Sequence, residues 1–356
     1  MTAPRFAEAR ELLTDGVSAR AYPAAVVEVG TAEGVQWREA VGTLTFAPDA
    51  APCAPGTVFD LASLTKVIVT TSVALRAVSD GPLSLDDRVA AHAPAWRGPD
   101  REHVTLRHLL DHSSGLPAYA DLWREIAGRD AFEAAICAAP LTQSPGTVSV
   151  YSDLGFILAG IVLERVTGQT LDAALPRLIA VDDDDVLTYL PDASLRPRIA
   201  PTERDRWRGR VLVGEVHDAN AAALGGVAAH AGVFGTASAV GAFARQVLAT
   251  FSRDSRLGAS AVMARFARPT GVPGSSRAIG WDTMLPTSSC GTLMSAGAIG
   301  HTGFTGTSLW IDRELDLYVV LLTNRVHPTR ENEQLRSLRP RIHDAIVRAM
   351  RADAAR

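Results

Sequence analysis

Residues 59–82 read FDLASLTKVIVTTSVALRAVSDGP, and this stretch decides the fold of the chain. Its apolar residues recur at the three- and four-residue spacing of a helix, and it ends at Asp80-Gly81-Pro82, which is a helix stop signal. The positions that carry this spacing are Leu64, Val67, Ile68, Thr71, Leu75 and Val78. Because nearly all faces of the helix are apolar, we predict a buried central helix with Ser63 at its first turn.

This stretch also holds the single lysine of the chain. Lys66 stands among 34 arginines in 356 residues and follows Ser63 by three positions. Arginine is in effect always protonated, whereas a desolvated lysine can lose its proton and act as a base. Position 66 is therefore expected to need more than a positive charge. The alternative is a lysine that follows a serine by chance, so the tetrad alone does not decide the function.

The spacing of Ser63 and Lys66 suits nucleophilic catalysis. Residues three apart lie on one face of a helix, so the Lys66 amine can reach the Ser63 hydroxyl. A helix N-terminus offers free backbone N–H groups and the positive end of the helix dipole. The dipole and burial both favour a neutral lysine. A neutral amine beside a serine oxygen activates a weak nucleophile.

Two further motifs follow in the chain. Tyr151-Ser152-Asp153 precedes an apolar helix, and His301-Thr302-Gly303 precedes a predicted hairpin. A tyrosine next to a lysine can relay a proton and protonate a leaving group. A glycine on an edge strand allows close backbone approach. The next N–H, that of Phe304, could pair with the Ser63 N–H as an oxyanion hole.

Strand patterns occur at the two ends of the chain and helical patterns in the middle. We predict an antiparallel sheet that joins the N- and C-terminal strands, with a helical second lobe. The expected division is 1–75 and 280–356 for the sheet lobe and 76–279 for the helical lobe, as one unit with the site between them. The expected strands are 24–30, 35–41, 308–311 and 317–323, the expected helices include 6–13, 155–166 and 331–350, and the stretch 181–212 is expected to be irregular.

The order of these motifs resembles that of serine β-lactamases and penicillin-binding proteins, with Ser-x-x-Lys, a Tyr-x-Asn-like motif and Lys/His-Thr-Gly. The resemblance is closest to the class C β-lactamase-like branch, which includes DD-peptidases and esterases, and it extends from about residue 20 to 350. The flanking segments that support it are LLDHSSGLP (109–117), VYSDLGFILAGIVLE (150–164), GEVHDANAAALGGVAAHAGVFGTA (214–237) and GHTGFTGTSLWID (300–312). It implies an α+β fold of the β-lactamase/DD-peptidase type.

The resemblance also implies a role for each motif residue. Ser63 would be the acylated nucleophile, Lys66 its base or proton partner, and Tyr151 the second base and leaving-group acid. His301 and Thr302 would contact the substrate, and the N–H groups of Ser63 and Phe304 would bind the oxyanion. The implied chemistry needs no metal and no organic cofactor.

Two positions depart from the pattern of the family. Asp153 stands where the family has asparagine, and an ionised carboxylate cannot donate a hydrogen bond to an amide substrate. It is expected either to pair with Lys66 and keep that amine charged or to cap the following helix. His301 replaces the usual lysine and loses a permanent charge that would bind a substrate carboxylate. These departures favour an esterase or amidase, unless a nearby arginine restores the charge.

Two other functions stay open. A β-lactamase or D-alanyl-D-alanine carboxypeptidase would be acylated by penicillins, and a non-catalytic scaffold or ligand sensor would have kept only the fold. His112, His217 and His230 are expected to hold loops rather than a metal. Asp182 to Asp185 is expected to be a solvated acidic turn.

Composition limits the partners. The net charge is −4 and the arginines are scattered, so we expect no nucleic acid partner, only a small ester, amide or β-lactam substrate. Three distant cysteines suggest no disulfide framework, and no apolar run is long enough for a membrane span. The N-terminal residues lack the pattern of a signal peptide, which favours a cytoplasmic location. The sequence does not indicate the oligomeric state.

Overall fold

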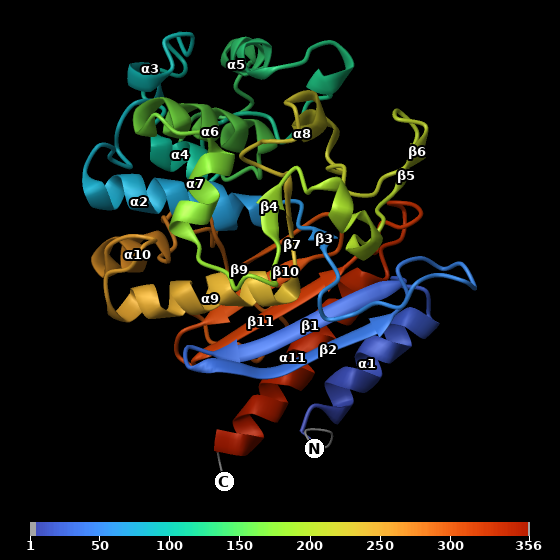
Figure 1. The fold of residues 1–356 in the computed structure, drawn as a ribbon. Helices are drawn as coiled ribbons and strands as arrows, with labels where there is room; N and C mark the ends of the chain where they lie inside the picture. Colours follow the sequence, from blue (N-terminus) through green and yellow to red (C-terminus); the bar gives the residue numbers. More distant parts are fainter. Residues whose placement is uncertain (1–4, 355–356) are drawn as a thin grey trace.

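A six-stranded antiparallel sheet forms one half of the protein in the computed structural model, which describes residues 5–354. The strand order is β2-β1-β11-β10-β9-β8, so strands from the two ends of the chain lie side by side (Figure 1). Ala25 of β1 pairs with Thr323 of β11. The strands are β1 (Ala24–Thr31), β2 (Gly34–Gly42), β8 (Asp282–Thr283), β9 (Ile299–Thr302), β10 (Ser308–Asp312) and β11 (Leu317–Thr323). The predicted joining of the two ends is confirmed.

Helices cover both faces of this sheet (Figure 1). α1 (Ala7–Ser18) and α11 (Leu335–Ala354) pack on one face, and α9 (Ala237–Ser252) packs on the other against β1 and β11. Side chains alternate along a strand, so Val27 joins the cluster under α1 and α11 while Val26 joins the main core on the opposite face. A strand buried on both faces is largely apolar, and β1 and β11 fit this rule with Glu28 as the main exception, since its buried carboxylate pairs with Arg38.

The helical part lies beyond α9 and is built around α6 (Asp153–Thr167), which agrees with the apolar helix predicted at 155–166. Residues 154–163 of α6 are all buried. The helical segments of this part are η1 (Lys66–Thr71), α2 (Ser72–Asp80), α3 (Val89–His92), α4 (Leu106–Leu110), η2 (Leu122–Arg124), α5 (Arg129–Ala138), α7 (Leu171–Leu178), η3 (Ala193–Arg198), α8 (Ala219–Ala223) and α10 (Ser260–Phe266). η1 and α2 continue as one helix that contacts α6, α7 and α10.

Three details differ from the sequence-based expectations. Ser63 lies in the turn just before the central helix, and η1 is a π-helical segment. The stretch 181–212 is not wholly irregular but contains η3 and three short strands, β4 (Leu187–Tyr189), β5 (Arg204–Asp205) and β6 (Arg210–Val211). α9 belongs to the range assigned to the helical lobe, yet its apolar side covers the sheet. The division into two lobes itself stays a prediction.

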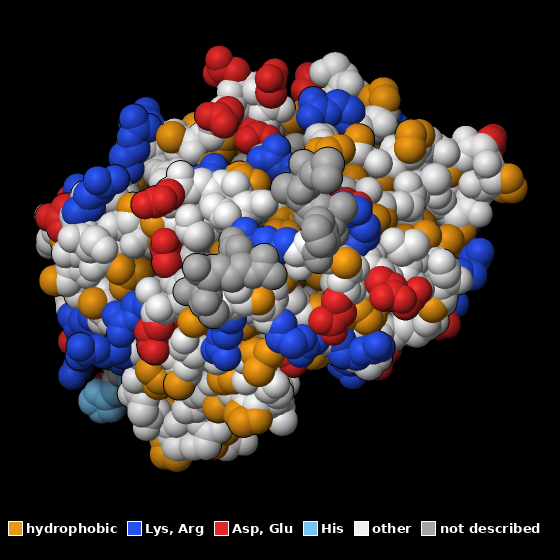
Figure 2. Space-filling model, turned by 90° about the horizontal axis from the view of Figure 1, so that it is seen from below, with side chains coloured by type: hydrophobic (Ala, Val, Ile, Leu, Met, Phe, Trp, Pro, Cys, Tyr) orange, Lys and Arg blue, Asp and Glu red, His pale blue; other side chains and the backbone are white. Residues whose placement is uncertain are grey.

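The cysteines, the surface charges and the lengths of the apolar helices complete the description of the fold. Cys53, Cys137 and Cys290 are free thiols. On the face seen in Figure 2, basic and acidic side chains are interspersed. In the part of the chain that the structure describes, no single helix is long and apolar enough to cross a membrane. α6 and α7 would reach that length only together, and they are bent by 74° at their junction.

Candidate active site

The chain approaches Ser63 from a short strand, β3 (Phe59–Asp60), in a second sheet of order β3-β7-β4 with β7 at Val233–Gly235. Directly after β3 the chain turns at Ala62, whose φ of 47° is unusual for a residue other than glycine. A hydrogen bond of 2.8 Å from the Ala62 N–H to Asp60 Oδ1 holds this turn. Ser63 itself is partly exposed, so its hydroxyl is accessible from the solvent side.

Lys66 is completely buried, and its ammonium group has three acceptors. Nζ donates to Ser63 Oγ at 2.9 Å, to Asp153 Oδ1 at 2.6 Å and to the carbonyl oxygen of His230 at 3.1 Å. An ammonium group has three N–H donors, so all of them are satisfied. The predicted contact between Ser63 and Lys66 is confirmed, and Asp153 proves to be the partner of Lys66.

This arrangement determines the charge of Lys66. Burial alone lowers the pKa of Lys66, but the neighbouring Asp153 carboxylate and the Tyr151 hydroxyl outweigh burial and raise that pKa above its ordinary value. The raised pKa contradicts the expectation of a neutral amine in the resting enzyme, and the hydrogen bond confirms the pairing of Lys66 with Asp153. The cap of α6 is Ser152, whose Oγ accepts from the Gly155 N–H at 3.1 Å, so Asp153 is free of that role.

Tyr151 lies beside this pair. Its ring centroid is 4.9 Å from Lys66 Nζ and 4.6 Å from the centroid of His112, and Arg277 lies over the ring at 5.0 Å. Burial raises the pKa of Tyr151, and hydrogen bonding to Lys66 and Ser63 only partly offsets the shift. The resting site thus holds an ammonium and a neutral phenol next to the Ser63 hydroxyl.

β9 brings the third motif to the other side of Ser63. His301 is buried, and its Nδ1 lies 2.8 Å from the carbonyl oxygen of Thr302. Burial lowers the pKa of His301 to about 4, so the ring is neutral at neutral pH. Thr302 is half-buried and lines the same cavity as Ser63. The lowered pKa agrees with the loss of positive charge at position 301 that the sequence indicates.

The loop after β9 lies against the Ser63 turn. Thr305 Oγ1 donates to the Asp60 carbonyl at 2.7 Å, and Thr307 Oγ1 donates to the Leu61 carbonyl at 3.0 Å. A side chain at Gly303 would collide with both Thr307 and Leu61, so glycine is required there. Within residues 5–354, the backbone N–H groups of Ser63 and Phe304 have no protein acceptor. Both are thus available to bind an oxyanion, as the sequence predicts.

Asp60 is a buried residue beside the site that the sequence analysis did not single out. Its side chain is buried, and its second oxygen accepts from the His217 N–H at 2.7 Å. The ring of His217 in turn stacks on Phe304, with centroids 5.6 Å apart. The Asp60 carboxylate therefore holds both the turn that carries Ser63 and the backbone of His217, whose ring packs on Phe304. Only its position three residues before Ser63 could have pointed to it.

We expect Asp60→Asn to lower kcat about 10- to 100-fold with little change in KM, because an amide N–H would face a backbone N–H and displace the Ser63 turn. Steady-state kinetics and the rate of Ser63 acylation measure this effect. Asp312→Asn is the matched control, since Asp312 is also fully buried and accepts from backbone N–H groups, but at the far end of β10. An equal loss of kcat in both variants would contradict a positioning role for Asp60.

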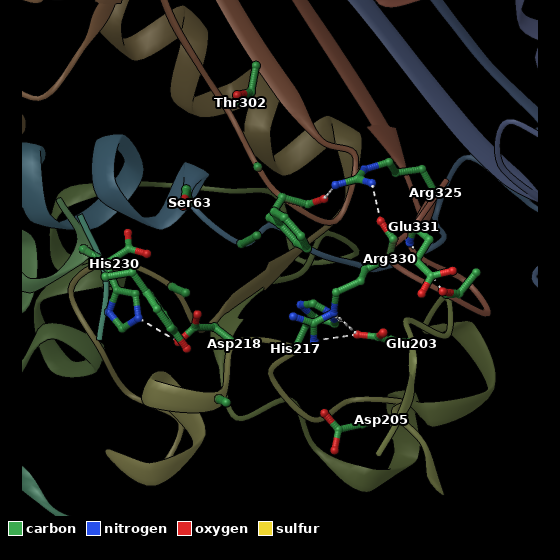
Figure 3. A pocket seen from close by; sticks show the side chains of 18 of the residues that line it. Ser63, Glu203, Asp205, His217, Asp218, His230, Thr302, Arg325, Arg330 and Glu331 are labelled. Carbon is green, nitrogen blue, oxygen red and sulfur yellow. Dashed lines mark hydrogen bonds and ion pairs between the residues drawn. The ribbon is translucent and has the colours of Figure 1, made fainter. Parts of the chain in front are cut away.

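The three further histidines hold loops at the site, as expected. His112 Nδ1 accepts from the Ser152 N–H at 2.9 Å. His217 Nε2 lies 2.9 Å from Glu203, and His230 Nε2 lies 2.8 Å from Asp218. Figure 3 shows both of these pairs at the cavity wall.

Acidic clusters give no metal site in the described part of the chain, where no group of three or more His, Cys, Asp or Glu side chains could hold an ion. Asp185 instead accepts hydrogen bonds from Thr236 and Ser238 at the start of α9. The acidic turn at 182–185 is thus partly structural rather than merely solvated.

The site opens into a cavity of about 1220 Å³ (Figure 3). Several arginines line it, and they differ in their partners. Arg330 pairs with Glu203, and Arg277 pairs with Asp282. Arg325 donates only to backbone carbonyls, including that of Phe304 at 2.7 Å. Arg339 is 8% exposed, and its closest hydrogen bond, to the Thr307 carbonyl, measures 3.4 Å.

A partly exposed serine bonded to a buried lysine, between an antiparallel sheet and a helical part, is the arrangement typical of serine hydrolases with a Ser-x-x-Lys motif. The family model described as Beta-lactamase matches residues 9–342. A protein of Escherichia coli K12 named D-alanyl-D-alanine carboxypeptidase is 30% identical over 307 residues, which are 76% of this chain and 70% of that protein. The N-acetylmuramyl-L-alanine amidase of Bacillus subtilis is 31% identical over 303 residues, or 76% and 68%. The chain belongs to the β-lactamase family of serine hydrolases.

Solved structures agree on the fold. A penicillin-binding protein homologue from Caulobacter crescentus has a TM-score of 0.77 at 20% identity and covers 97% of this chain and 98% of its own. A mutant of simvastatin synthase from Aspergillus terreus has a TM-score of 0.77 at 21% identity, with 99% of both chains covered. EstCE1, a hydrolase with promiscuous acyltransferase activity, has a TM-score of 0.76 at 20% identity, with 96% and 98% covered. The predicted fold is confirmed.

Proposed function

We propose that the protein hydrolyses esters through an acyl-enzyme on Ser63. Ser63 Oγ attacks the carbonyl carbon, and the oxyanion that forms accepts hydrogen bonds from the Ser63 and Phe304 N–H groups. Collapse of this intermediate breaks the bond to the leaving oxygen, which takes a proton from Tyr151. A water molecule then attacks the acyl-enzyme, releases the acid and returns the Ser63 hydroxyl.

The observation that carries the proposal is the chain of contacts from Ser63 through Lys66 to Asp153. A buried ammonium bonded to the serine oxygen stabilises the negative charge that develops there during attack. The reactive form has one proton fewer than the resting form, shared between Lys66 and Tyr151, because the Ser63 proton must go to one of them. Because Lys66 and Tyr151 are in contact with each other, either of them can receive the Ser63 proton.

The neutral His301 supports esters over substrates that carry a carboxylate next to the scissile bond. Such a carboxylate would meet an uncharged imidazole rather than an ammonium at this position. An ester also has a better leaving group than an amide, so its departure depends less on protonation by Tyr151.

Ser63→Ala is expected to lower p-nitrophenyl butyrate hydrolysis at least about 10⁴-fold, since it removes the group that is acylated. Ser337→Ala, at an exposed serine of α11, is the matched control and should hydrolyse the ester like the wild type. Turnover that survives in Ser63→Ala would overturn the proposal. Failure of the wild type both to turn over and to react with a fluorophosphonate at Ser63 would favour a non-catalytic scaffold.

A second candidate is a D-alanyl-D-alanine carboxypeptidase or β-lactamase. Arg339 favours it, because this buried guanidinium lines the cavity without a carboxylate partner among the described residues. A substrate carboxylate could supply that partner. The name of the Escherichia coli relative points the same way.

Cleavage of two related peptides distinguishes the esterase from the carboxypeptidase. A carboxypeptidase is expected to cleave a peptide that ends in D-Ala-D-Ala at least about tenfold faster than the same peptide with a terminal amide, and Arg339→Met should abolish that preference. An esterase is expected to cleave neither peptide at a rate near that of the ester. Mass spectrometry of the released amine, which is D-alanine from the first peptide and D-alaninamide from the second, distinguishes these outcomes.

A further inference from the structure

The cavity collects the exposed aromatic side chains of the protein. Within residues 5–354, three aromatic side chains are exposed, namely Tyr119 at 42%, Trp207 at 47% and Phe304 at 49%, and all three line the cavity that contains Ser63. The other large exposed apolar side chains are aliphatic and lie outside it. They are Val35, Val148, Leu190 and Leu285. Exposed aromatic surface confined to one hollow indicates a binding surface.

These rings come from separate parts of the chain. Tyr119 and the half-buried Trp123 belong to the segment around η2, Trp207 lies in the turn between β5 and β6, and Phe304 follows β9. The rings of Trp123 and Trp207 meet with centroids 4.7 Å apart and planes tilted by 46°. Their meeting is therefore a product of the tertiary fold, not of neighbouring positions in the sequence.

Polar contacts hold Trp123 in place. Trp123 Nε1 donates to Asp121 Oδ1 at 3.1 Å, and the Trp123 backbone N–H donates to Asn220 Oδ1 at 3.0 Å. Arg124 lies over the Trp123 ring at 4.2 Å. These contacts fix the ring before any ligand arrives, which lowers the entropic cost of binding.

Trp207 has a similar support in Arg208, which lies 5.4 Å from the ring centroid. Arg208 is itself fixed, because it donates to Asp205 and to the carbonyls of Val216 and His217. Arg124 is likewise held by Asp121, to which its Nε donates at 2.9 Å, so each ring has an anchored cation against it.

We propose that Trp123 and Trp207, with Tyr119 and Phe304 on the wall of the same cavity, form a subsite for a planar aromatic ring carried by the substrate. Aromatic rings pack on one another in offset or tilted arrangements and gain more from this than from buried area alone. The cavity of about 1220 Å³ is also larger than a small aliphatic ester would fill. The proposal rests on the proposed function in one respect, which is that this ring belongs to a molecule that reaches Ser63.

The test uses binding to Ser63→Ala, so that it does not depend on turnover. Isothermal titration calorimetry compares N-(2-phenylethyl)-3-phenylpropanamide, which has a ring on each side of its carbonyl, with the dicyclohexyl analogue. Cyclohexyl is the more hydrophobic group, so simple apolar burial would favour the analogue. We expect the diphenyl amide to bind about three- to tenfold more tightly, from the usual gain of aromatic pairs.

Variants in the Ser63→Ala background locate the effect. Trp207→Leu is expected to remove the preference for phenyl, Trp207→Phe to keep most of it, and Leu285→Ala, at an exposed leucine outside the cavity, to leave it unchanged. Thermal melting checks that each variant is folded, and mixed amides with one phenyl group show which side of the carbonyl the ring occupies.

Three outcomes would overturn the subsite. They are equal or tighter binding of the dicyclohexyl amide, no binding of either amide, and a phenyl preference that survives in Trp207→Leu. The ester hydrolysis of the wild type and Ser63→Ala reports separately on the proposed function, so a failure of one proposal is not mistaken for a failure of the other.

Discussion

Lys66→Arg is expected to lower kcat about 10³-fold, even though the substitution keeps the positive charge. The lysine ammonium donates to Ser63, Asp153 and the His230 carbonyl from one point, and no atom of Lys66 is exposed. A planar guanidinium cannot reproduce those three directions in the same space. It also cannot take part in proton transfer, because it stays protonated at any working pH.

The measurement is steady-state hydrolysis of p-nitrophenyl butyrate, together with the rate of labelling of Ser63 by a fluorophosphonate. Lys66→Met serves as the comparison, because it fills a similar volume but has neither charge nor proton. Thermal melting separates loss of folding from loss of chemistry. A Lys66→Arg enzyme that is folded and turns over at a rate near that of the wild type would show that any cation suffices.

Local spacing was enough to predict the nucleophile pair. Ser63 and Lys66 are three residues apart where the central helix begins, and the Lys66 N–H donates to the Ser63 carbonyl at 3.0 Å, so a single turn of the backbone brings their side chains together. Local strand patterns at the two ends of the chain also predicted that their strands share one sheet, although the patterns did not specify that β1 pairs with β11.

Contacts between distant segments could not be predicted in the same way. The sequence left open whether Asp153 caps α6 or pairs with Lys66, 87 positions away, and only the packing of α6 on η1 decides it. The neutral amine expected from burial was wrong for this reason. Asp60 was missed because its second partner, the His217 N–H, lies 157 positions away. The meeting of Trp123 and Trp207 likewise depends on two loops that have no common pattern.

Asp153→Asn is expected to move the acidic limb of the pH profile of kcat/KM to lower pH by about one unit or more. The negative charge of Asp153 raises the pKa of both Lys66 and Tyr151. Removing this charge lowers the apparent pKa at which the coupled pair loses the proton needed for the reactive form, whichever of the two groups holds it. Activity of the variant should therefore fall off at a lower pH than that of the wild type.

This substitution also restores the asparagine that the family pattern has at this position, so it tests what the departure at Asp153 does. Rates of p-nitrophenyl butyrate hydrolysis from pH 5 to 9 give the profile, and Glu331→Gln, at another acidic side chain of the cavity, is the control that should leave it unchanged. If the pH of the acidic limb does not change, Asp153 holds the Lys66 side chain in place without shifting the pKa of the pair. A limb that moves to higher pH would contradict the electrostatic account of the site. Removing a negative charge next to an ammonium destabilises the protonated form, so it should lower the pKa of the Lys66–Tyr151 pair and not raise it.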